Sequence, residues 1–362
     1  MERIVISGIN LFEAGPLSIF YDCLDCIIDQ GLYKNYKIIA FVHKKELFEK
    51  YVGYVSLIEL PKSRNSYIFR LYYEYIFFNR WSKGKKIDVW LSLHDITPNV
   101  NAKRLYTYCH NPSPFMKKDL RKIKYSFTYV AFSFLYKYLY RINIHKANAV
   151  IVQQEWIRNE FKKMFPVRKV IVAKPNISVD YNFNNNISKL NDKPIFIFSS
   201  YPRFYKNFEV ICKACKLLEN LRFEVWLTLD GSENSYSKDL VIKYGSVRNI
   251  KWLGLQTRDK VFELYNKADY LLFPSLLETW GLPISEFKCT GKGVVLADLP
   301  YAHETLGNYD KAVFFNPQDE VELSRIIKDI IENDSVFQRV RIKNVDSPYA
   351  ENWVQLFDMI CD

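Results

Sequence analysis

The stretch DYLLFPSLLETWGLPISEFKCTGKGVVLAD, residues 269–298, decides the fold. A short apolar run, DYLLF, is followed by a loop, by a helix pattern that begins near Pro283, and by a second apolar run, GVVLA. Proline suits the first turn of a helix, because the amide that it lacks would have no partner there. Two fully apolar runs joined by a helix are typical of parallel strands whose sheet is covered by helices on both faces.

The same alternation extends in both directions along the chain. Short apolar runs are separated by helix patterns in the N-terminal half and again in the C-terminal half. The runs are IVISG, YKIIAFVH, VSLIEL, IDVWLSL, RLYTYCH and AVIVQQ in the first half, and IFIFSS, FEVWLTLD, NIKWLG, DYLLFPS, GVVLAD and AVFFN in the second. Two series of this kind predict two α/β domains, each built on a parallel sheet.

The boundary between the two series lies in residues 177–193. This stretch is rich in Asn, Ser and Asp and has no sustained apolar period, which indicates a linker. We therefore expect one domain in residues 1–176 and a second in residues 194–347. Ligands of open α/β sheets bind beyond the carboxyl ends of the strands, so the cleft between two such domains is the predicted site.

Composition and charge restrict the class of protein. The chain has 362 residues, of which 49% are apolar, so it can bury a full core, and disorder or a small disulfide scaffold is excluded. Lys and Arg number 51 against 40 Asp and Glu, a net charge of +11. Residues 101–170 hold 15 basic and 3 acidic side chains, which places the excess on one basic face.

The cysteines and the apolar runs indicate the compartment. The seven cysteines are an odd number, and no signal-peptide pattern precedes the first predicted strand, so we expect a reducing cytoplasm. The pairs in CLDC and CKAC lie inside amphipathic helix patterns, where this spacing stacks residues on one face, so a structural role is favoured over a metal or redox site. The longest uncharged apolar run, Tyr125–Tyr136, is too short for the ~20 residues of a membrane-spanning helix.

The loop and helix of the opening stretch carry two acidic side chains. Glu278 precedes the helix, and Glu286 lies about one turn inside it. The backbone amides of residues 280–284 and the positive end of the helix dipole favour a phosphate or sugar hydroxyls, and the two carboxylates can accept hydrogen bonds from sugar hydroxyls and a ribose diol. The alternative is that two acidic residues near a helix start only stabilise the helix dipole.

This segment resembles the E-x7-E signature of the group 1, or family 4, retaining glycosyltransferases. ETWGLPISE is similar to the usual E-G-F-G-L-P-x-x-E, with Thr279 and Trp280 as the main departures. The resemblance extends over nearly the whole chain and implies the GT-B architecture, in which two Rossmann-like domains face a cleft. It also implies that the first domain binds the acceptor, that the second binds the nucleotide sugar, and that a helix in residues 348–362 crosses back to the first domain.

Within this resemblance, Glu278 approaches the donor sugar and Glu286 binds the ribose. The backbone of the intervening residues meets the sugar and the diphosphate; these residues are Trp280, Gly281, Leu282 and Pro283. Gly254, which ends the NIKWLG run, lies where the backbone of the family contacts the base.

A cationic loop follows the first strand of the second domain. In FSSYPRFYKNFEV, Arg203 and Lys206 come after a strand that ends at Ser200, where they can neutralise a diphosphate leaving group. The family usually has an Arg and a Lys about five residues apart here. Lys206 matches, whereas Tyr201 stands five positions earlier. A merely structural cationic loop is the alternative, although positive charge near a helix start opposes the dipole.

The first domain offers candidates at three strand ends. Gly15 precedes the first helix, where the family accommodates the nucleotide sugar, and nearby Glu13 is a candidate for acceptor binding. His110 ends the RLYTYCH run, and the resemblance implies that it contacts the donor sugar and phosphate. His94 and Asp95 end the previous run, where they bind the acceptor or Asp95 only caps a turn.

Two segments combine aromatic and basic side chains, residues 66–81 and 115–141. Such sequences fit helices at the interface of an anionic membrane, and the alternative is a helix pair packed on the sheet with lysines that reach out to water. Nucleic acid is disfavoured, because no nucleic-acid-binding module accompanies the basic residues.

The sequence therefore predicts a retaining glycosyltransferase. It would move a hexose from a nucleotide-diphosphate sugar to a glycan or polyprenyl-linked acceptor, in the cytoplasm at the inner face of the membrane, within bacterial lipopolysaccharide O-antigen, capsule or exopolysaccharide synthesis. No metal or other cofactor is expected, because there is no D-x-D motif and cationic side chains handle the leaving group. The alternatives are an inactive scaffold or membrane-binding protein of this fold, or a nucleotide-sugar hydrolase or epimerase.

Overall fold

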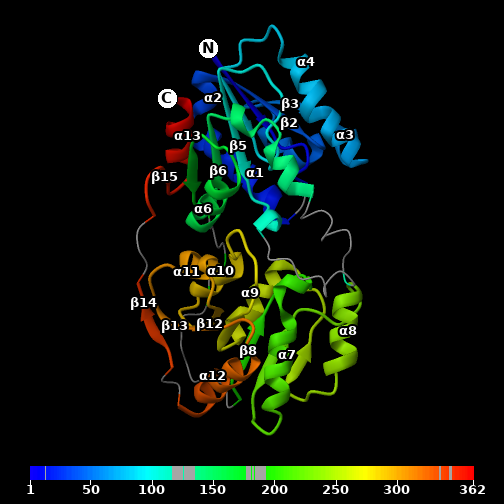
Figure 1. Cartoon of the computed structure of the whole chain (residues 1–362), viewed down its shortest axis with the longest axis vertical. Helices are drawn as coiled ribbons and strands as arrows, with labels where there is room; N and C mark the ends of the chain where they lie inside the picture. The colour runs from blue at the N-terminus through cyan, green and yellow to red at the C-terminus, as the bar shows by residue number, and fades with distance from the viewer. Residues whose placement is uncertain are drawn as a thin grey trace. The chain divides into compact units, whose positions relative to one another are not determined.

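A computed structural model gives the fold of the chain (Figure 1). It describes residues 1–12, 14–115, 125, 135–176, 181, 183, 193–333, 336–341 and 345–362. The chain divides into two compact units. Unit 1 comprises Met1–Met116, Tyr129–Asn176 and Val345–Asp362, and unit 2 comprises Lys117–Thr128 and Ile177–Asn344. Nearly all of the predicted linker and most of residues 115–141 lie outside the described residues.

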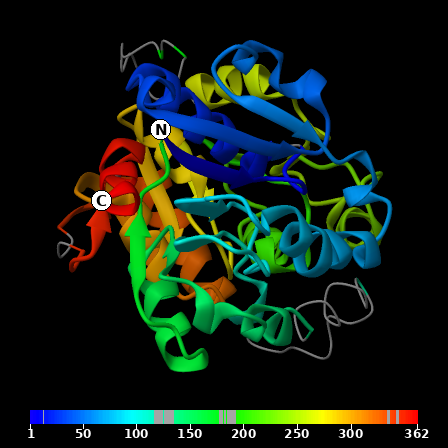
Figure 2. The same ribbon diagram turned by 90° about the horizontal axis from the view of Figure 1, so that it is seen from above.

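Unit 1 is built on a sheet of eight described strands, all paired in parallel (Figure 2). Their order is β15-β7-β6-β5-β4-β1-β2-β3. The strands are β1 (Glu2–Ser7), β2 (Tyr36–Val42), β3 (Ser56–Glu59), β4 (Val89–Ser92), β5 (Arg104–Cys109), β6 (Ala149–Val152), β7 (Val170–Ala173) and β15 (Tyr349–Ala350). All six predicted runs of the first half contain a strand.

Helices cover both faces of this sheet, which explains why its strands are mostly apolar. Along β1, Ile4 and Ile6 pack with α1 (Ala14–Asp29) and α13 (Trp353–Cys361), whereas Val5 packs on the opposite face with α4 (Phe78–Ser82). The other helical segments are α2 (Leu32–Asn35), η1 (Lys45–Tyr51), η2 (Pro61–Arg64), α3 (Tyr67–Tyr72), the π-helical η3 (Tyr73–Phe77), η4 (Ser113–Phe115), η6 (Ile144–Lys146), α6 (Glu155–Met164) and residues 135–141. The C-terminal helix α13 thus belongs to the core of unit 1.

Unit 2 has a sheet of seven described strands in the order β10-β9-β8-β11-β12-β13-β14. The strands are β8 (Ile195–Phe198), β9 (Glu224–Leu227), β10 (Ile250–Trp252), β11 (Tyr270–Phe273), β12 (Gly293–Ala297), β13 (Tyr309–Phe315) and β14 (Gln338–Val340). All pairs are parallel except β13 with β14, which is antiparallel. The sheet therefore departs from the predicted parallel pattern at one edge, where a reversed strand is common.

The helices of unit 2 connect these strands. They are η7 (Phe204–Lys206), α7 (Phe208–Leu217), α8 (Ser235–Tyr244), α9 (Arg258–Lys267), α10 (Leu282–Lys288), α11 (Pro300–Leu306) and α12 (Glu320–Asn333). The opening stretch of the sequence is the β11–α10–β12 unit, and its two strands are direct neighbours in the sheet.

The cysteine pairs lie inside helices and are buried. Cys23 and Cys26 are in α1, and Cys212 and Cys215 are in α7. Burial raises the pKa of all four thiols, which disfavours the thiolate that metal binding and redox exchange require. Within the described residues, no three metal-ligating side chains form a cluster, and no helix is long and apolar enough to cross a bilayer.

Candidate functional site

Lys206 and Glu278 meet at the carboxyl edge of the unit 2 sheet. Strands β8 and β11 are parallel neighbours, so the loops that follow them leave the sheet at the same edge. Lys206 is the last residue of η7 after β8, and Glu278 lies in the loop after β11. Lys206 Nζ lies 2.5 Å from Glu278 Oε1, and the two side chains are 16% and 13% exposed. Two residues 72 positions apart thus form a charge pair that water can still reach.

The start of α10 shapes the segment between the two glutamates. Gly281 precedes the helix with φ of +86°, a conformation that favours glycine, and Pro283 lies in the first turn. The amide of Ile284 donates to the carbonyl of Gly281, and Pro283 has no amide, so fewer free donors are left here than the five-residue stretch suggested. The indole of Trp280 is buried and donates to Ser285 Oγ at 3.0 Å, so this side chain packs within the protein.

Glu286 forms a second charge pair at this edge. Its carboxylate lies 3.1 Å from Nη2 of Arg258, at the start of α9, and the side chains are 10% and 59% exposed respectively. Burial raises the pKa of Glu286, and the Arg258 guanidinium acts in the opposite direction. A carboxylate held by an exposed cation near the loop after β10 can accept hydrogen bonds from a diol.

Gly254 lies in that same loop. Its φ is +67°, and a Cβ there would come within 2.9 Å of Asp230 Oδ2, so both conformation and space require glycine. Asp230 in turn receives the amide of Ser232 and closes the turn after β9. The predicted role of Gly254 in a base contact remains a prediction, because these observations concern only the loop itself.

Arg203 belongs to the loop of Lys206 but is engaged elsewhere. Its guanidinium donates to the hydroxyl of Tyr205 at 2.8 Å and lies 5.8 Å from the centre of the Tyr201 ring. The carbonyl of Arg203 also accepts the amide of Lys206. Arg203 thus shapes the loop that presents Lys206.

In unit 1, His110 follows β5 and its side chain is 11% exposed. Asp95 Oδ1 accepts the amides of His110 and Asn111, so this carboxylate closes the turn around His110. That arrangement matches the capping alternative for Asp95. Glu13 lies outside the described residues, and Gly15 is the second residue of α1, where an added Cβ would meet no atom within 4 Å.

His94, a candidate for acceptor binding, is completely buried. Its Nε2 lies 3.0 Å from Ser7 Oγ, and its Nδ1 lies 3.1 Å from Oε1 of Glu74, in η3. Arg70 of α3, also buried, donates to the carbonyl of His94 at 2.8 Å. The side chain of His94 is thus enclosed by protein groups.

This buried polar network was missed in the sequence. Arg70 and Glu74 are spaced four residues apart, which on a helix usually marks a solvent-exposed pair. A signal was nevertheless present, because Glu74 is the only acidic residue between positions 60 and 87. Burial raises the pKa of Glu74 to about 8, against the effect of Arg70, and lowers that of His94 well below its ordinary value.

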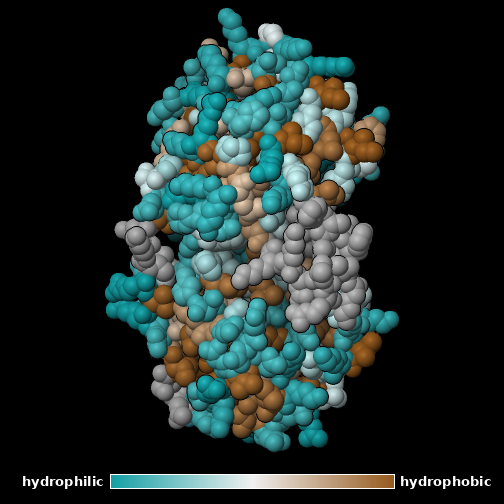
Figure 3. Space-filling view, viewed as in Figure 1, coloured by the Kyte–Doolittle hydropathy of each residue, from teal (hydrophilic) through white to brown (hydrophobic). Residues whose placement is uncertain are grey.

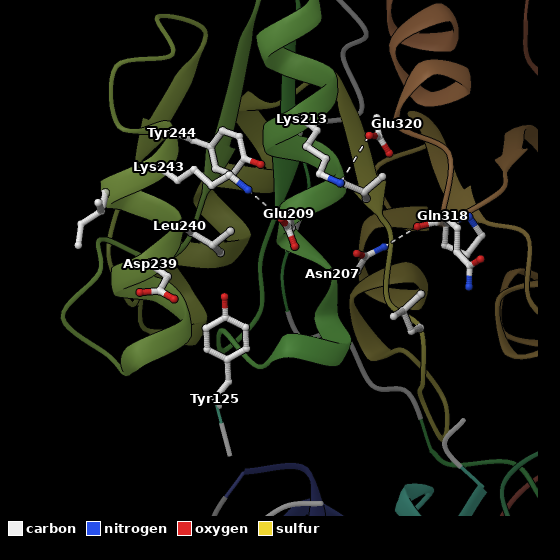
Figure 4. Close-up of a pocket in the computed structure, with 14 residues that line it drawn as sticks. Tyr125, Asn207, Glu209, Lys213, Asp239, Leu240, Lys243, Tyr244, Gln318 and Glu320 are labelled. Carbon is white, nitrogen blue, oxygen red and sulfur yellow. Dashed lines mark hydrogen bonds and ion pairs between the residues drawn. The ribbon is translucent and has the colours of Figure 1, made fainter. Parts of the chain in front are cut away.

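A cavity of about 760 Å³ lies elsewhere on unit 2, between α7, α8 and the start of α12. Figure 4 shows its wall, where Lys213 reaches toward Glu320 and Lys243 toward Glu209, with nitrogen–oxygen distances of 3.5 and 3.3 Å. None of the predicted site residues lines this cavity. Four of its five charged side chains are thus paired with one another, and the fifth is Asp239.

Comparison with known proteins shows which family the chain resembles. Residues 180–345 match the family model of the glycosyl transferases group 1. The O-antigen chain mannosyltransferase RfbU of Salmonella typhimurium is 22% identical over 253 residues, which span 67% of this chain and 68% of RfbU.

Solved structures extend the likeness to both units. Sucrose-phosphate synthase from Thermosynechococcus elongatus superposes with a TM-score of 0.66 at 14% identity, over 93% of this chain and 91% of that chain. Alr3699/HepE of Anabaena, solved with UDP and glucose, has a TM-score of 0.60 at 14% identity, over 93% and 92% of the two chains. Residues 180–345 are therefore similar to the glycosyl transferases group 1, and the chain has the predicted GT-B fold.

Proposed function

We propose that this protein transfers a sugar from a nucleotide-diphosphate sugar to a glycan acceptor with retention of configuration. The observation that carries the proposal is the meeting of Lys206 and Glu278 at the carboxyl edge of the unit 2 sheet, where Glu286 and Arg258 form a second pair. Charged groups that water can reach at a strand edge are suited to a polar, anionic ligand.

Each residue then has a defined task. The Lys206 ammonium neutralises the diphosphate as it departs, which is the largest charge that develops in the reaction. Glu278 holds that ammonium in place and accepts a hydrogen bond from the donor sugar. Glu286 accepts hydrogen bonds from the ribose diol, with Arg258 fixing its carboxylate.

Retention follows from attack on the face from which the diphosphate leaves. The bond between the anomeric carbon and the phosphate oxygen breaks, and the acceptor oxygen bonds to the same face of that carbon. The acceptor proton passes to the departing phosphate oxygen, so no protein nucleophile is needed. We propose that the cationic side chains make a divalent metal unnecessary, which activity in the presence of EDTA would test.

The substrate class follows from the similar proteins by analogy. RfbU is named as an O-antigen chain mannosyltransferase, and HepE was crystallised with UDP and glucose. We therefore propose a lipid-linked glycan of a bacterial surface polysaccharide, such as an O-antigen, as acceptor. Because the sugars of the two similar proteins differ, the donor base and sugar have to be measured, and UDP and GDP are the first two to test.

An exposed apolar surface on unit 1 supports a location at the cytoplasmic face of the membrane. Figure 3 shows hydrophobic residues gathered over α3 and η3. The exposed hydrophobic side chains of α3 and η3 are Tyr67, Ile68, Phe69, Tyr72 and Ile76. The single acidic residue of positions 60–87, Glu74, points inward, and six exposed Lys and Arg flank the helices. Such a surface fits anionic lipid, which would bring the enzyme to a lipid-linked acceptor.

Sedimentation with vesicles tests this location. Binding to phosphatidylglycerol vesicles, but not to phosphatidylcholine vesicles, should be weakened several-fold by Ile68→Asp, since a charge would enter the interface. Exposed Val321→Asp in α12 is the matched control and should leave binding unchanged. Equal binding by both variants would exclude α3 as the contact.

The donor site is tested by calorimetric titration with UDP and GDP in the presence of EDTA. Saturable binding of one nucleotide should be weakened by Lys206→Ala and by Glu286→Ala. Lys243→Ala, which breaks a Lys–Glu pair of the same unit away from the site, is the control and should bind normally. A folded protein that binds neither nucleotide at millimolar concentration would refute the donor site, and sugar release without acceptor would instead indicate a hydrolase.

A further inference from the structure

Asp95 has an unusual backbone conformation. It lies after β4 with φ of +70°, and the only other non-glycine residues with positive φ in the described residues are Asn143 and Asn207. The left-handed region costs a residue with a side chain ~1 kcal/mol or more, and Asp and Asn tolerate it best. A strained residue persists only where its surroundings hold it.

The surroundings of Asp95 hold it through both backbone and side chain. Its amide donates to the carbonyl of Tyr108 on β5 at 3.0 Å. Its Oδ1 accepts the amide of His110 at 2.8 Å and that of Asn111 at 3.0 Å. The hydroxyl of Tyr140 lies 3.1 Å from the same oxygen. One oxygen thus fixes the turn that carries His110.

The second oxygen faces the imidazole. Asp95 Oδ2 lies 3.8 Å from His110 Nε2, too far for a hydrogen bond but close enough for strong electrostatic attraction at a buried site. His110 Nδ1 is buried and has no hydrogen-bond partner among the described residues. A negative oxygen beside Nε2 favours the tautomer with hydrogen on that nitrogen, which leaves Nδ1 with a lone pair.

We propose that Asp95 is a positioning residue for His110, which fixes the turn with Oδ1 and selects the Nε2–H tautomer with Oδ2. Asp95 thereby holds the imidazole of His110 in one orientation and one tautomer, with the lone pair of the buried Nδ1 inside the protein. The part of this inference that concerns sugar transfer rests on the proposed function, in which His110 meets the donor sugar.

Asp95→Asn separates the two tasks. Asn tolerates the same backbone conformation, and its amide oxygen can replace Oδ1 as acceptor for the two backbone amides. Those donors force the oxygen toward the turn, so the amide NH₂ takes the place of Oδ2 beside His110. A donor beside Nε2 favours the opposite tautomer, with hydrogen on Nδ1.

The first readout is the ¹⁵N NMR spectrum of histidine-labelled protein. The chain has five histidines, and His110 is assigned by the signal that disappears in His110→Gln. We expect the Nε2–H tautomer in the parent protein and the Nδ1–H tautomer in Asp95→Asn. Asp88→Asn is the matched control, because Asp88 accepts the amide of Arg3 at the other end of β4, far along the strand from His110. Its spectrum should match that of the parent protein.

The second readout is the kinetics of sugar transfer. Asp95→Asn should lower kcat by ~10- to 100-fold, the effect of losing a partner that orients a histidine, with nucleotide affinity and melting temperature nearly unchanged. Its pH–rate profile should also change, which a merely structural role would not cause. An unchanged tautomer, or an unchanged kcat, would overturn the proposal. If the parent protein fails to bind nucleotides, the proposed function fails, whereas the NMR result still decides whether Asp95 sets the tautomer.

Discussion

Two groups of charged residues in this protein use the same residue types in opposite ways. In unit 2, Glu286 is paired with Arg258, whose side chain is 59% exposed. In unit 1, Arg70 and Glu74 are both buried beneath the α3 and η3 helices. A ligand can exchange partners with the exposed pair, but no ligand reaches the buried one. Exposure, rather than residue type, therefore separates binding groups from groups that hold the fold.

The buried polar network around Arg70 has no net charge only if one of its carboxyl groups is neutral. It contains one permanent cation, Arg70, and two carboxyls, Glu74 and Asp95. Burial raises the pKa of Glu74 to about 8 and lowers that of His94, so both are mainly uncharged at pH 7. We assign the Glu74 proton to the contact with His94 Nδ1, and Asp95 is then left to balance Arg70.

Replacing Arg70 should have the largest effect on the free energy of unfolding. Arg70→Met leaves the Asp95 charge without its buried cation and removes the hydrogen bond to the His94 carbonyl. Loss of one partner from a buried charged group costs about 3–5 kcal/mol in the free energy of unfolding. Urea denaturation measures this, and exposed Arg80→Met should change stability by less than about 0.5 kcal/mol. An equal loss of unfolding free energy in Arg70→Met and Arg80→Met would mean that burial of the arginine does not determine its contribution to stability.

Lys206→Ala should have the opposite profile, with a large effect on activity and a smaller one on stability. The ammonium acts on charge that develops in the transition state, so its loss should lower kcat by about 10²–10³-fold. The melting temperature should fall less than in Arg70→Met, because the pair with Glu278 keeps some contact with water whereas Arg70 is fully enclosed. Steady-state kinetics and thermal melting together decide this, with Lys243→Ala as the control. A fully active Lys206→Ala protein would contradict the role given to Lys206.

The sequence predicted most of this fold for a physical reason. Strands covered on both faces are mostly apolar, and all twelve predicted runs, which were chosen on that ground, contain strands. Two of the three strands that were not predicted carry weaker signals, since β14 is an exposed antiparallel edge and β15 has two residues. The third, β7, was missed although its run VIVA is as apolar as the predicted runs.

Some contacts of the candidate site could be predicted from the sequence, and others could not. The meeting of Lys206 and Glu278 follows from parallel strands ending at one edge, which sequence alone can suggest. The burial of Arg70 and Glu74 depends on which face of a helix turns toward β4, and helical spacing alone cannot supply that. The pairing of Glu286 with Arg258 depends in the same way on where α9 begins relative to α10.

Measuring the unfolding free energy as a function of pH should show whether Glu74 is protonated in the folded protein. Glu74 holds its proton more tightly in the folded protein than the ordinary carboxyl of the unfolded chain. Stability from this residue is therefore complete below about pH 4.5 and is lost as pH rises toward 8, by at most about 1.4 kcal/mol per pH unit. Arg70 and Tyr75 on its own helix and His94 from the β4 loop face this carboxyl. Glu74→Gln should flatten the fall in urea-denaturation stability, and an unaltered slope would show that Glu74 is ionised when folded.

We expect the smallest effect for Arg258→Ala, which, like Arg70→Met, removes an arginine near a glutamate. Arg258→Ala removes a half-exposed partner of Glu286, and such pairs contribute about 0.2–1 kcal/mol. Nucleotide affinity measured by calorimetry should fall by a factor of about 1.4 to 5, because Glu286 loses the cation that fixes its carboxylate. The unfolding free energy should stay the same, in contrast to Arg70→Met. Tighter binding would instead mean that Arg258 competes with the ribose for Glu286, so that the exposed pair must open before the donor enters.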